Sequence, residues 1–241
     1  EGETIKMKWN LEKLLFDFGV NGIEEKLEKL ERYKSGILEW NKKVNITKIT
    51  NDDDFYRLHY IGSLLCTQSE EFKNSEQIID VGTGGGFPGI PMAIVFPEKN
   101  FLLLDSSRKR LNIIEMLAEE LGIKNIEVLH GRAEEIATSA EYREKFDLCV
   151  SRAVARLQIL VEYCLGFVKV GGTMIAFKGP GAEEEISDAS KAIAVMGGFL
   201  NGVKNFQEEA GKFGFEENHR WIYIMKSQNT PGKYPRSGGK S

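Results

Sequence analysis

The stretch QIIDVGTGGGFPGIPMAIVFP, residues 77–97, decides the fold of this chain. It begins with the apolar run IIDV (78–81), which is typical of a buried strand, and it continues directly into a cluster of glycines. Pro88 suits the first turn of a helix, apolar residues after it supply that helix, and Pro97 stops it. The stretch therefore predicts a strand, a glycine loop and a helix. Such a loop lets a cofactor approach the backbone closely at the carboxyl edge of a parallel sheet.

Length and composition limit the class of protein to which this unit belongs. The chain has 241 residues, of which 41% are hydrophobic and 28% charged, so it can bury a core as one large domain or as a domain with an appendage. No run approaches the roughly 18 apolar residues of a membrane-spanning helix. The first residues, EGETIKMKWN, have neither the basic start nor the apolar core of a signal peptide. We therefore expect a cytoplasmic protein without membrane contact.

Cysteines, histidines and net charge exclude further classes. The cysteines at positions 66, 149 and 164 form no Cys-x-x-Cys pair, which argues against a disulfide framework and a zinc site. The histidines at positions 59, 130 and 219 have no metal-ligand spacing, so we expect no metal. The formal net charge of −4 argues against a protein that coats nucleic acid through bulk charge. Any basic surface has to be local.

The first 70 residues predict a helical appendage. Apolar residues recur at three- and four-residue intervals over residues 23–41, and an earlier apolar cluster ends at Gly19. The segment WNKKVNITKIT (40–50) that follows is interpreted as a solvated loop, although it carries several lysines. In the next segment, His59 and Ser63 are four residues apart. This spacing favours a helix-capping role over a base and a nucleophile, because no acid of the triad type is placed to orient the histidine.

Apolar segments and helices alternate regularly after the glycine loop. Further strands are predicted at FLLLD (101–105), IEVL (126–129), FDLCV (146–150) and TMIAF (173–177). Helices are expected after Ser107 up to Gly122, from about 154 to 165, and over 183–196. This alternation predicts a doubly wound α/β sheet. Segments near 199–203 and 221–225 are expected to add a final antiparallel hairpin.

The end of the chain is basic although the whole chain is acidic. From residue 218 onward it contains no Asp or Glu, and its cations are Arg220, Lys226, Lys233, Arg236 and Lys240. Together with the Pro and Gly of TPGKYPRSGGK, this composition predicts an extended, partly disordered segment that lies along a phosphate backbone. A tail that only improves solubility is the alternative.

The strand ends indicate which cofactor the glycine loop binds. Gly84, Gly86 and Gly89 match G-x-G-x-x-G, so a nicotinamide oxidoreductase has to be considered. However, the clustered G-T-G-G-G after Asp80 resembles the first motif of class I S-adenosylmethionine-dependent methyltransferases. Asp105 ends the second strand, where a fixed carboxylate can accept both ribose hydroxyls. Arg132-Ala133-Glu134 after the third strand and Ser151-Arg152-Ala153 after the fourth fit the adenine and active-site edges of that class.

A longer series of motifs resembles one family within this class. WNKKVNITKIT, His59-x-x-x-Ser63-Leu64, DVGTGGGFPGIPMAIVFP, LLDSSRKR, GRAEEI, SRAVARL, AFKG and NTPGKYPR follow one another as in the bacterial 16S ribosomal RNA (guanine-N7) methyltransferase family, also called glucose-inhibited division protein B. The resemblance runs from about residue 40 to residue 236. It implies that S-adenosylmethionine is the cofactor, and that the product is a 7-methylguanosine in the decoding-region loop of small-subunit ribosomal RNA.

The resemblance also implies roles for single residues. Gly82 and Phe87 are expected against the methionine and adenosine, Ala133 and Glu134 at the adenine. The full set of expected cofactor-binding residues is Gly82, Gly84, Gly86, Phe87, Asp105, Ala133, Glu134 and Arg152. Arg152 is also the expected catalytic residue, beside the transferring methyl group and the RNA. One departure is Gly62, which stands where the family commonly has Asp, and it puts the roles of His59 and Ser63 in question.

The implied chemistry suits the residues that are present. Guanine N7 carries an exposed lone pair, so its attack on the sulfonium methyl is an in-line displacement that needs positioning rather than a base. Because methylation makes the purine positive, Arg152 is expected to hold a phosphate, the carbonyl O6 or the methionine carboxylate. The expected RNA-binding residues are Lys42, Lys43, Arg156, Lys178, Lys233 and Arg236.

The expected organisation has three parts. They are the appendage over residues 1–70, an S-adenosylmethionine-binding methyltransferase domain over 71–226, and the basic tail over 227–241. Two alternatives to the ribosomal assignment are a methyltransferase acting on a protein or small metabolite, and a non-catalytic ribosome-assembly factor. Salt dependence distinguishes a ribosomal RNA methyltransferase from one that acts on a protein or small metabolite, because RNA binding weakens steeply with ionic strength. A nicotinamide oxidoreductase is distinguished from a methyltransferase by which of the two cofactors raises the melting temperature of the protein.

Overall fold

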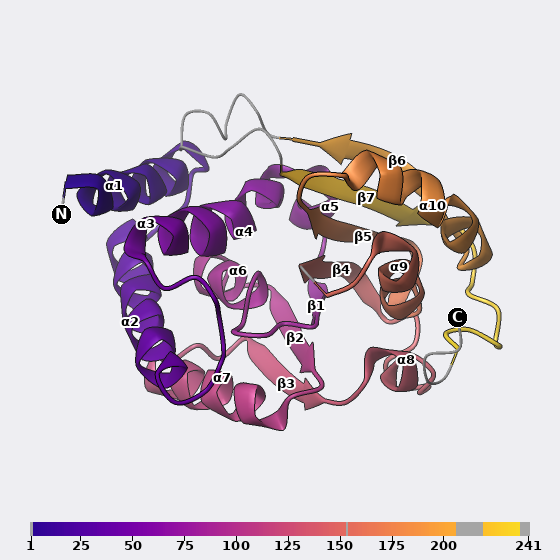
Figure 1. Ribbon diagram of the computed structural model, residues 1–241, viewed down its shortest axis with the longest axis horizontal. Coiled ribbons are helices and arrows are strands. Elements are labelled where there is room, and N and C mark those ends of the chain that lie inside the picture. Colours follow the sequence, from indigo (N-terminus) through magenta and orange to yellow (C-terminus); the bar gives the residue numbers. More distant parts are fainter. Residues whose placement is uncertain (1, 153, 206–218, 237–241) are drawn as a thin grey trace.

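A mixed sheet of seven strands runs through the centre of the molecule, in the order β3-β2-β1-β4-β5-β7-β6 (Figure 1). The computed structural model describes residues 2–152, 154–205 and 219–236, with side chains from Asn10 onward and at Lys8. The strands are β1 (Gln77–Val81), β2 (Asn100–Asp105), β3 (Ile126–His130), β4 (Phe146–Arg152), β5 (Val168–Lys178), β6 (Gly198–Lys204) and β7 (Arg220–Lys226). Neighbours among β1–β5 pair parallel, whereas β7 pairs antiparallel with both β5 and β6.

Helices cover both faces of this sheet, which confirms the doubly wound prediction. One face carries α6 (Gly89–Val95), α7 (Arg108–Glu120) and α2 (Ile23–Asn41), and the other carries α8 (Ala133–Ile136), α9 (Leu157–Leu165) and α10 (Ala182–Val195) (Figure 1). Successive strand residues point to opposite faces, so Ile78 belongs to the first buried cluster and Ile79 to the second. The strand order reverses between β1 and β4. Ligands of open α/β sheets bind outside the carboxyl ends of the strands at such a reversal.

The N-terminal helices pack onto the first of these faces. They are α1 (Gly2–Asp17), α2, α3 (Asp52–Asp54), a π-helical segment (Phe55–Ile61), α4 (Gly62–Leu64), a 3₁₀ turn (Leu65–Gln68) and α5 (Glu70–Lys73). Tyr33 of α2 and Tyr60 of the π-helical segment are fully buried in the same cluster as Ile78 of β1. The two predicted N-terminal helices are therefore confirmed. The division into residues 1–70, 71–226 and 227–241 stays a prediction.

Two elements differ from their predicted bounds. Strand β4 extends to Arg152, and α9 begins only at Leu157, whose backbone N–H donates to the carboxylate of Glu185 at 2.6 Å. Strand β5 begins at Val168, earlier than predicted, and pairs with Phe146 before its register shifts. The final antiparallel hairpin of β6 and β7 is confirmed, with an irregularity between Leu200 and Gly202.

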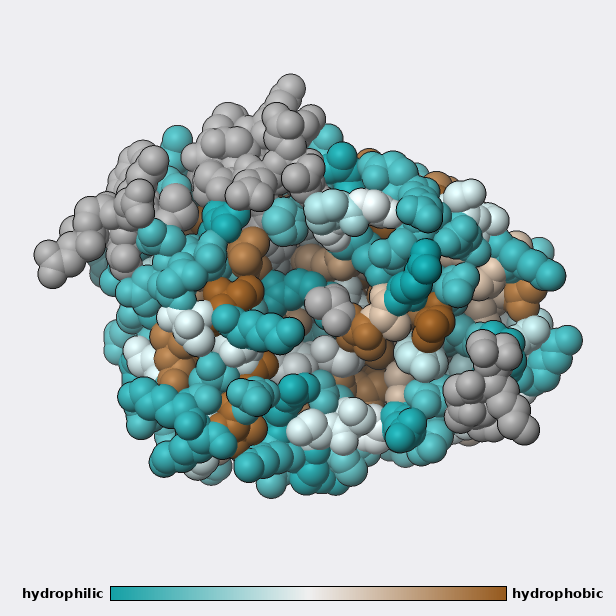
Figure 2. All heavy atoms as spheres, in the orientation of Figure 1, coloured by the Kyte–Doolittle hydropathy of each residue, from teal (hydrophilic) through white to brown (hydrophobic). Residues whose placement is uncertain are grey.

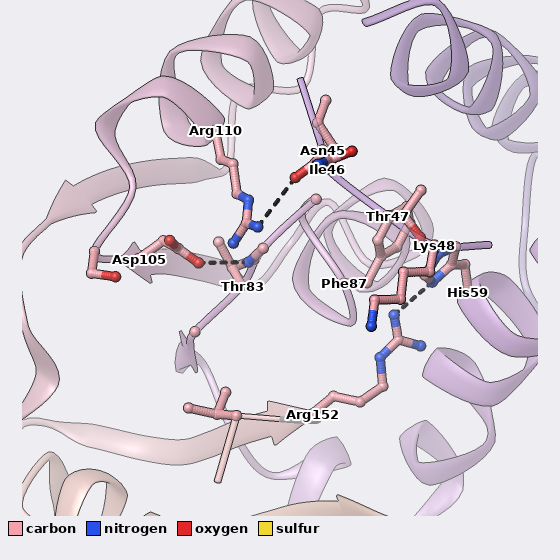
Figure 3. A pocket seen from close by; sticks show the side chains of 15 residues that line it. Asn45, Ile46, Thr47, Lys48, His59, Thr83, Phe87, Asp105, Arg110 and Arg152 are labelled. Carbon is pink, nitrogen blue, oxygen red and sulfur yellow. Dashed lines mark hydrogen bonds between the residues drawn. The ribbon is translucent and has the colours of Figure 1, made fainter. Parts of the chain in front are cut away.

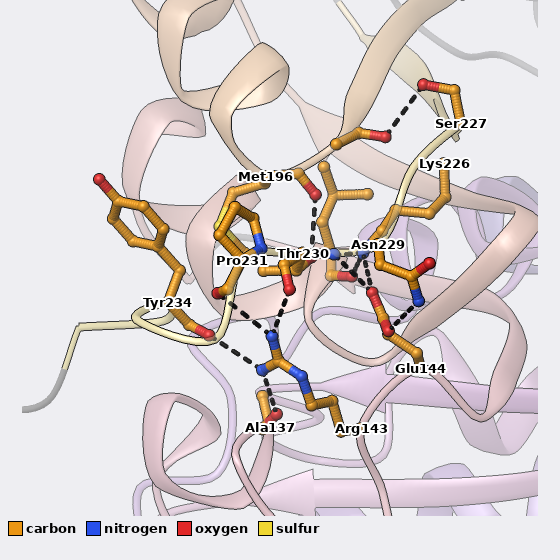
Figure 4. A network of polar contacts seen from close by, with 12 residues as sticks. Ala137, Arg143, Glu144, Met196, Lys226, Ser227, Asn229, Thr230, Pro231 and Tyr234 are labelled. Carbon is orange, nitrogen blue, oxygen red and sulfur yellow. Dashed lines mark hydrogen bonds and ion pairs between the residues drawn. The ribbon is translucent and has the colours of Figure 1, made fainter.

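The described part of the tail is ordered, so the expectation of a partly disordered segment is wrong for residues 227–236. Figure 4 shows how side chains from the β3–β4 connection hold it. The Arg143 guanidinium donates to the carbonyls of Thr230 (2.7 Å) and Tyr234 (2.9 Å), and Glu144 accepts the Thr230 N–H at 2.6 Å. Lys240 lies outside the described residues. Within the described ranges, no helix is long and apolar enough to cross a membrane.

Candidate functional site

A cavity of about 740 Å³ opens at the carboxyl ends of β1 and β4, where the strand order reverses (Figure 3). The glycine loop, Asp105 at the end of β2 and Arg152 at the end of β4 line it from the sheet side. His59 and residues 45–48 line it from the N-terminal side. Figure 2 shows that this face of the molecule is hollowed near its middle. The cavity therefore lies at the position that the topology predicts for a ligand.

The glycine loop is held by a buried carboxylate beneath it. Asp80 of β1 is fully buried, and its Oδ2 accepts the Thr83 hydroxyl at 2.7 Å and the Gly89 N–H at 2.8 Å. Burial raises the pKa of Asp80 to about 6, although these hydrogen bonds and the charge of Arg152 act against the rise. Gly82 and Gly84 have φ of 73° and 60°, a region that side chains disfavour. The loop therefore keeps one shape, with its backbone exposed to the cavity.

Asp105 joins the glycine loop to the neighbouring strand. Its Oδ2 accepts the Gly84 N–H at 2.8 Å, and its Oδ1 accepts the Ser107 N–H at 2.8 Å at the start of α7. The side chain is buried except where it meets the cavity. Each carboxylate oxygen has a second lone pair, so the group can accept further hydrogen bonds from a ligand.

Arg152 is bound by the π-helical segment across the cavity. Its Nη1 donates to the Leu58 carbonyl at 2.7 Å, and its Nη2 donates to His59 Nδ1 at 2.6 Å. Burial lowers the pKa of Arg152 only to about 10, so the guanidinium is charged at neutral pH. Burial and the facing guanidinium lower the pKa of His59 to about 2, so the imidazole is neutral.

The His59 ring lies flat on Phe87, at 3.9 Å between ring centroids and an angle of 10°. Tyr33 and Phe55 pack edge-on against the same phenyl ring, and Phe87 is only 4% exposed. Phe87 therefore supports His59 over a large part of its surface, besides lining the cavity. The sequence indicated only a capping role for His59, and the contact with Arg152 connects residues 93 positions apart.

Residues 45–48 form the second part of the cavity; the sequence pointed to their segment as a family motif with lysines for RNA, but not as cavity lining. Asn41 Oδ1 accepts the N–H groups of Ile46 (2.8 Å) and Thr47 (3.0 Å), which turns the chain after α2. Arg110 of α7 donates to the Asn45 carbonyl at 3.1 Å. This segment was interpreted as a solvated loop. The signal that was available is Asn41, because an Asn side chain can hold a turn through nearby backbone N–H groups.

The expected cofactor residues fall into two groups. Gly82, Gly84, Phe87, Asp105 and Arg152 all line the cavity. The remaining three residues, Gly86, Ala133 and Glu134, do not line it. A Cβ at Gly86 would lie 2.5 Å from Tyr33 Oη, so this glycine allows close packing with α2 instead. Glu134 is 6% exposed at the start of α8, with Arg132 Nη1 3.7 Å from its carboxylate. Ala153 lies outside the described residues.

Most of the expected RNA-binding cations already have a partner within the chain. Lys178 donates to Glu185 (2.7 Å) and to the Ala155 carbonyl (2.6 Å), and its side chain is 9% exposed. Arg236 binds both oxygens of Glu162 through Nε and Nη2.

The other four expected cations are exposed, as is Arg236. Arg156 pairs with Asp188 at 3.1 Å, Lys42 pairs with Glu39 at 2.5 Å, and the ammonium groups of Lys43 and Lys233 lie over Trp40 and Tyr234, respectively. These surface pairs are weak and open readily to solvent. Among the described residues, no group of three His, Cys, Asp or Glu side chains is arranged to hold a metal.

The fold is that of the class I S-adenosylmethionine-dependent methyltransferases. An O-methyltransferase family protein from Burkholderia thailandensis has a similar structure, with a TM-score of 0.55 over 86% of this chain and 71% of that one. The [4+2]-cyclase SpnF matches with a TM-score of 0.50 over 68% of this chain and 79% of that one. Their sequence identities, 10% and 13%, mean that these similarities concern the fold alone.

Sequence comparison identifies the family within this class. The family model "rRNA small subunit methyltransferase G" matches residues 26–213. The Ribosomal RNA small subunit methyltransferase G of Clostridium novyi is 44% identical over 90% of this chain and 87% of that protein. Its namesake from Alkaliphilus oremlandii is 45% identical over 90% and 89%. The chain belongs to the rRNA small subunit methyltransferase G family, and S-adenosylmethionine is its cofactor.

The residues around the cavity fit this cofactor. Asp105 presents a fixed carboxylate at the end of β2, where a ribose diol needs an acceptor. The glycine loop offers backbone without side chains, and a Cβ at Gly82 would lie 2.3 Å from Val154 Cγ2 at the cavity wall. Arg152 carries a positive charge at the cavity, with which a carboxylate can pair. The cavity thus has a group for each polar end of the cofactor.

Proposed function

We propose that this enzyme transfers the methyl group of S-adenosylmethionine to N7 of one guanine in 16S ribosomal RNA. The observation that carries the proposal is the meeting of the glycine loop, Asp105 and Arg152 at one cavity. The family, whose members are named for the small-subunit ribosomal RNA, supplies the substrate class. A ribosomal RNA substrate also supports the expected cytoplasmic location.

The side chains around the cavity support an uncharged nucleophile such as N7. When bound, the cofactor would supply an electrophilic methyl on a sulfonium. The bond to N7 would form as the carbon–sulfur bond breaks, S-adenosylhomocysteine would leave, and N7 would lose no proton. Among the described residues that line the cavity, His59 has the one imidazole; it is neutral, and its two nitrogens are already bound by Arg152 and Thr47. Asp80 lies fully buried beneath the loop. Positioning by Asp105, the glycine loop and Arg152 therefore replaces general-base catalysis in this proposal.

We infer that the RNA meets the enzyme around the mouth of the cavity. Lys48 lines the cavity and is exposed, and Lys42 and Lys43 precede it in the same exposed segment. Arg156 and Lys233 are exposed too, but they do not line the cavity. Lys178 and Arg236 contribute to a phosphate contact only if they leave Glu185 and Glu162, so we expect them to add less.

The proposal is tested by methyl transfer to its substrate. Small-subunit ribosomal RNA and assembled subunits from cells lacking the protein are incubated with the enzyme and labelled S-adenosylmethionine. Chemical cleavage specific for 7-methylguanine then locates the product. A single cleaved guanine is the expected result. Binding of the cofactor without label in either the RNA or the subunit contradicts the proposal, and it turns attention to protein or metabolite acceptors.

A further inference from the structure

Three polar side chains from distant segments form one hydrogen-bonded row at the edge of the cavity. Arg152 Nη2 lies 2.6 Å from His59 Nδ1, and His59 Nε2 lies 2.9 Å from Thr47 Oγ1 (Figure 3). All three residues line the cavity. The row therefore connects β4, the π-helical segment and the loop after α2 at the place where the ligand binds.

The donors and acceptors in this row have only one consistent arrangement. A guanidinium has N–H donors and no acceptor, so Nδ1 of the neutral His59 accepts and its hydrogen is on Nε2. The Nε2–H then donates to Thr47 Oγ1. The same oxygen accepts the Ile49 N–H at 3.1 Å. Both lone pairs of the Thr47 hydroxyl are thus used, and its hydrogen is directed elsewhere. Among the described residues, no acceptor contacts that hydrogen within the chain.

We propose that the Thr47 hydroxyl donates a hydrogen bond to an acceptor oxygen of the ligand in the cavity, and that Arg152 and His59 fix it as a donor. This inference rests on the proposed function. Two ligand oxygens have the required chemistry, the carboxylate of the methionine moiety and O6 of the guanine. A donor at O6 also discriminates against adenine, which presents an amino group at that position.

Ligand binding without RNA tests whether the methionine carboxylate is the acceptor. Dissociation constants of S-adenosylmethionine and of 5′-methylthioadenosine, which lacks the carboxylate, are measured calorimetrically for wild type, Thr47→Val and Thr47→Ser. If the carboxylate is the acceptor, Thr47→Val weakens binding of S-adenosylmethionine about 10-fold and leaves 5′-methylthioadenosine unchanged. Thr47→Ser keeps the hydroxyl and stays close to wild type. Thr50→Val, in the same loop and outside the cavity lining, is the matched control.

Methyl transfer tests whether O6 of the guanine is the acceptor. Small subunits are reconstituted with guanine or with 2-aminopurine, which has N7 and lacks O6, at the modified position. If O6 is the acceptor, Thr47→Val lowers kcat/KM about 10-fold on guanine and not on 2-aminopurine, while cofactor binding is unchanged. The proposal is overturned if Thr47→Val equals Thr47→Ser in both tests. Loss of ribosomal transfer by the wild type, with the carboxylate result intact, contradicts the proposed function alone.

The role of His59 is tested by coupling. His59→Phe keeps a ring on Phe87 and removes both nitrogens, so the effect of Thr47→Val should vanish in that background. His59→Gln retains one acceptor and one donor, and it should restore part of the effect. Strictly additive effects of His59→Phe and Thr47→Val overturn the proposed row, because Thr47 then acts without His59.

Discussion

Two arginines of this enzyme, Arg143 and Arg152, show how the same side chain serves structure in one place and a ligand in another. Arg143 donates from Nη1 to the carbonyls of Ala137 and Tyr234 and from Nη2 to those of Thr230 and Pro231 (Figure 4). Arg152 has one recorded contact from each terminal nitrogen, to Leu58 and His59, and it lines the cavity.

The difference lies in the number of N–H groups that the protein itself uses. A guanidinium has two N–H groups on each terminal nitrogen. Arg143 has a carbonyl for every one of these four terminal N–H groups, so it is a structural cross-link. Within the described residues, Arg152 has partners for half of them and keeps a donor and a charge for a ligand.

Replacing Arg152 should have the largest effect on catalysis. Arg152→Ala removes a charge-assisted contact to the ligand and the donor to His59, so we expect kcat/KM to fall about 100-fold. Single-turnover methyl transfer measures the loss. Arg152→Lys, which keeps the charge and lacks the fork, should recover only part of it. Full turnover by Arg152→Ala would remove this residue from the site.

Replacing Arg143 should lower the stability of the fold and leave methyl transfer almost unchanged. Arg143→Leu leaves carbonyls of the tail and of Ala137 without their donor, so the free energy of unfolding should fall by about 2 kcal/mol. Urea denaturation measures this change, and limited proteolysis should cut the chain after β7 sooner. Methyl transfer at saturating substrate should stay within about twofold of wild type, because the cavity is built elsewhere. A catalytic loss as large as that of Arg152→Ala would refute the contrast.

Replacing Asp105 tests whether the end of β2 contributes to cofactor binding. Asp105→Asn keeps an oxygen for the Gly84 or Ser107 N–H and loses the charge and one acceptor, so cofactor affinity should fall about 10-fold. Calorimetric titration with S-adenosylhomocysteine measures the loss. Glu134→Gln, which alters an acid outside the cavity lining, is the matched comparison and should cost less. The reverse order would place the adenosine nearer α8 than proposed.

The acid stability of the enzyme should report the neutral state of His59. Its pKa is 6.5 in an ordinary environment and about 2 in the fold, where Arg152 is the charged group that faces it. Below pH 6.5 the unfolded chain therefore binds a proton that the folded chain does not, and stability falls with falling pH.

Asp80 acts with the opposite sign. Its pKa rises from 3.8 to about 6, so the folded chain retains a proton between these values and gains stability as the pH falls through 6. Because Asp80 is present in both proteins, comparing wild type with His59→Phe isolates the histidine. As the pH is lowered from 7.5 to 5, the melting temperature should fall less for His59→Phe than for wild type. Parallel curves of melting temperature against pH would contradict a buried neutral imidazole.

Surface lysines should have the smallest effects. Lys48→Gln should lower the slope of RNA affinity against salt concentration by about one, because one phosphate contact is lost. Lys178→Gln should change it less, because Glu185 already binds this ammonium. Filter binding of small-subunit RNA at several salt concentrations measures both. A larger effect at Lys178 would move the RNA surface toward the end of β5.

The sheet followed from local patterns in the sequence, because apolar runs of strand length predicted β1 to β7. The resemblance to methyltransferases assigned Asp105 and Arg152 at two strand ends, and both line the cavity, whereas Ala133 and Glu134, assigned in the same way, do not. His59 and Thr47 were missed because their function depends on a contact with a residue far along the chain. The spacing of His59 and Ser63 along the chain fits a helix cap as well as it fits a contact in the cavity.

The tail was misjudged for a related reason. Its own residues contain no acid, and composition predicted a free basic segment. The groups that hold it, Glu144 and Glu162, come from elements 86 and 74 residues earlier in the chain. Charge composition within a window cannot register partners outside that window.

The contact between Arg152 and His59 also determines when the enzyme becomes complete during its synthesis. The segment that carries Thr47 and His59 leaves the peptide tunnel first, and its partner on β4 follows 93 residues later. At roughly 5–20 residues per second, that interval lasts about 5–20 seconds, during which the N-terminal helices have only strands β1 to β3 of the sheet to cover. A nascent chain that stalls before β4 therefore has its glycine loop but no finished cavity.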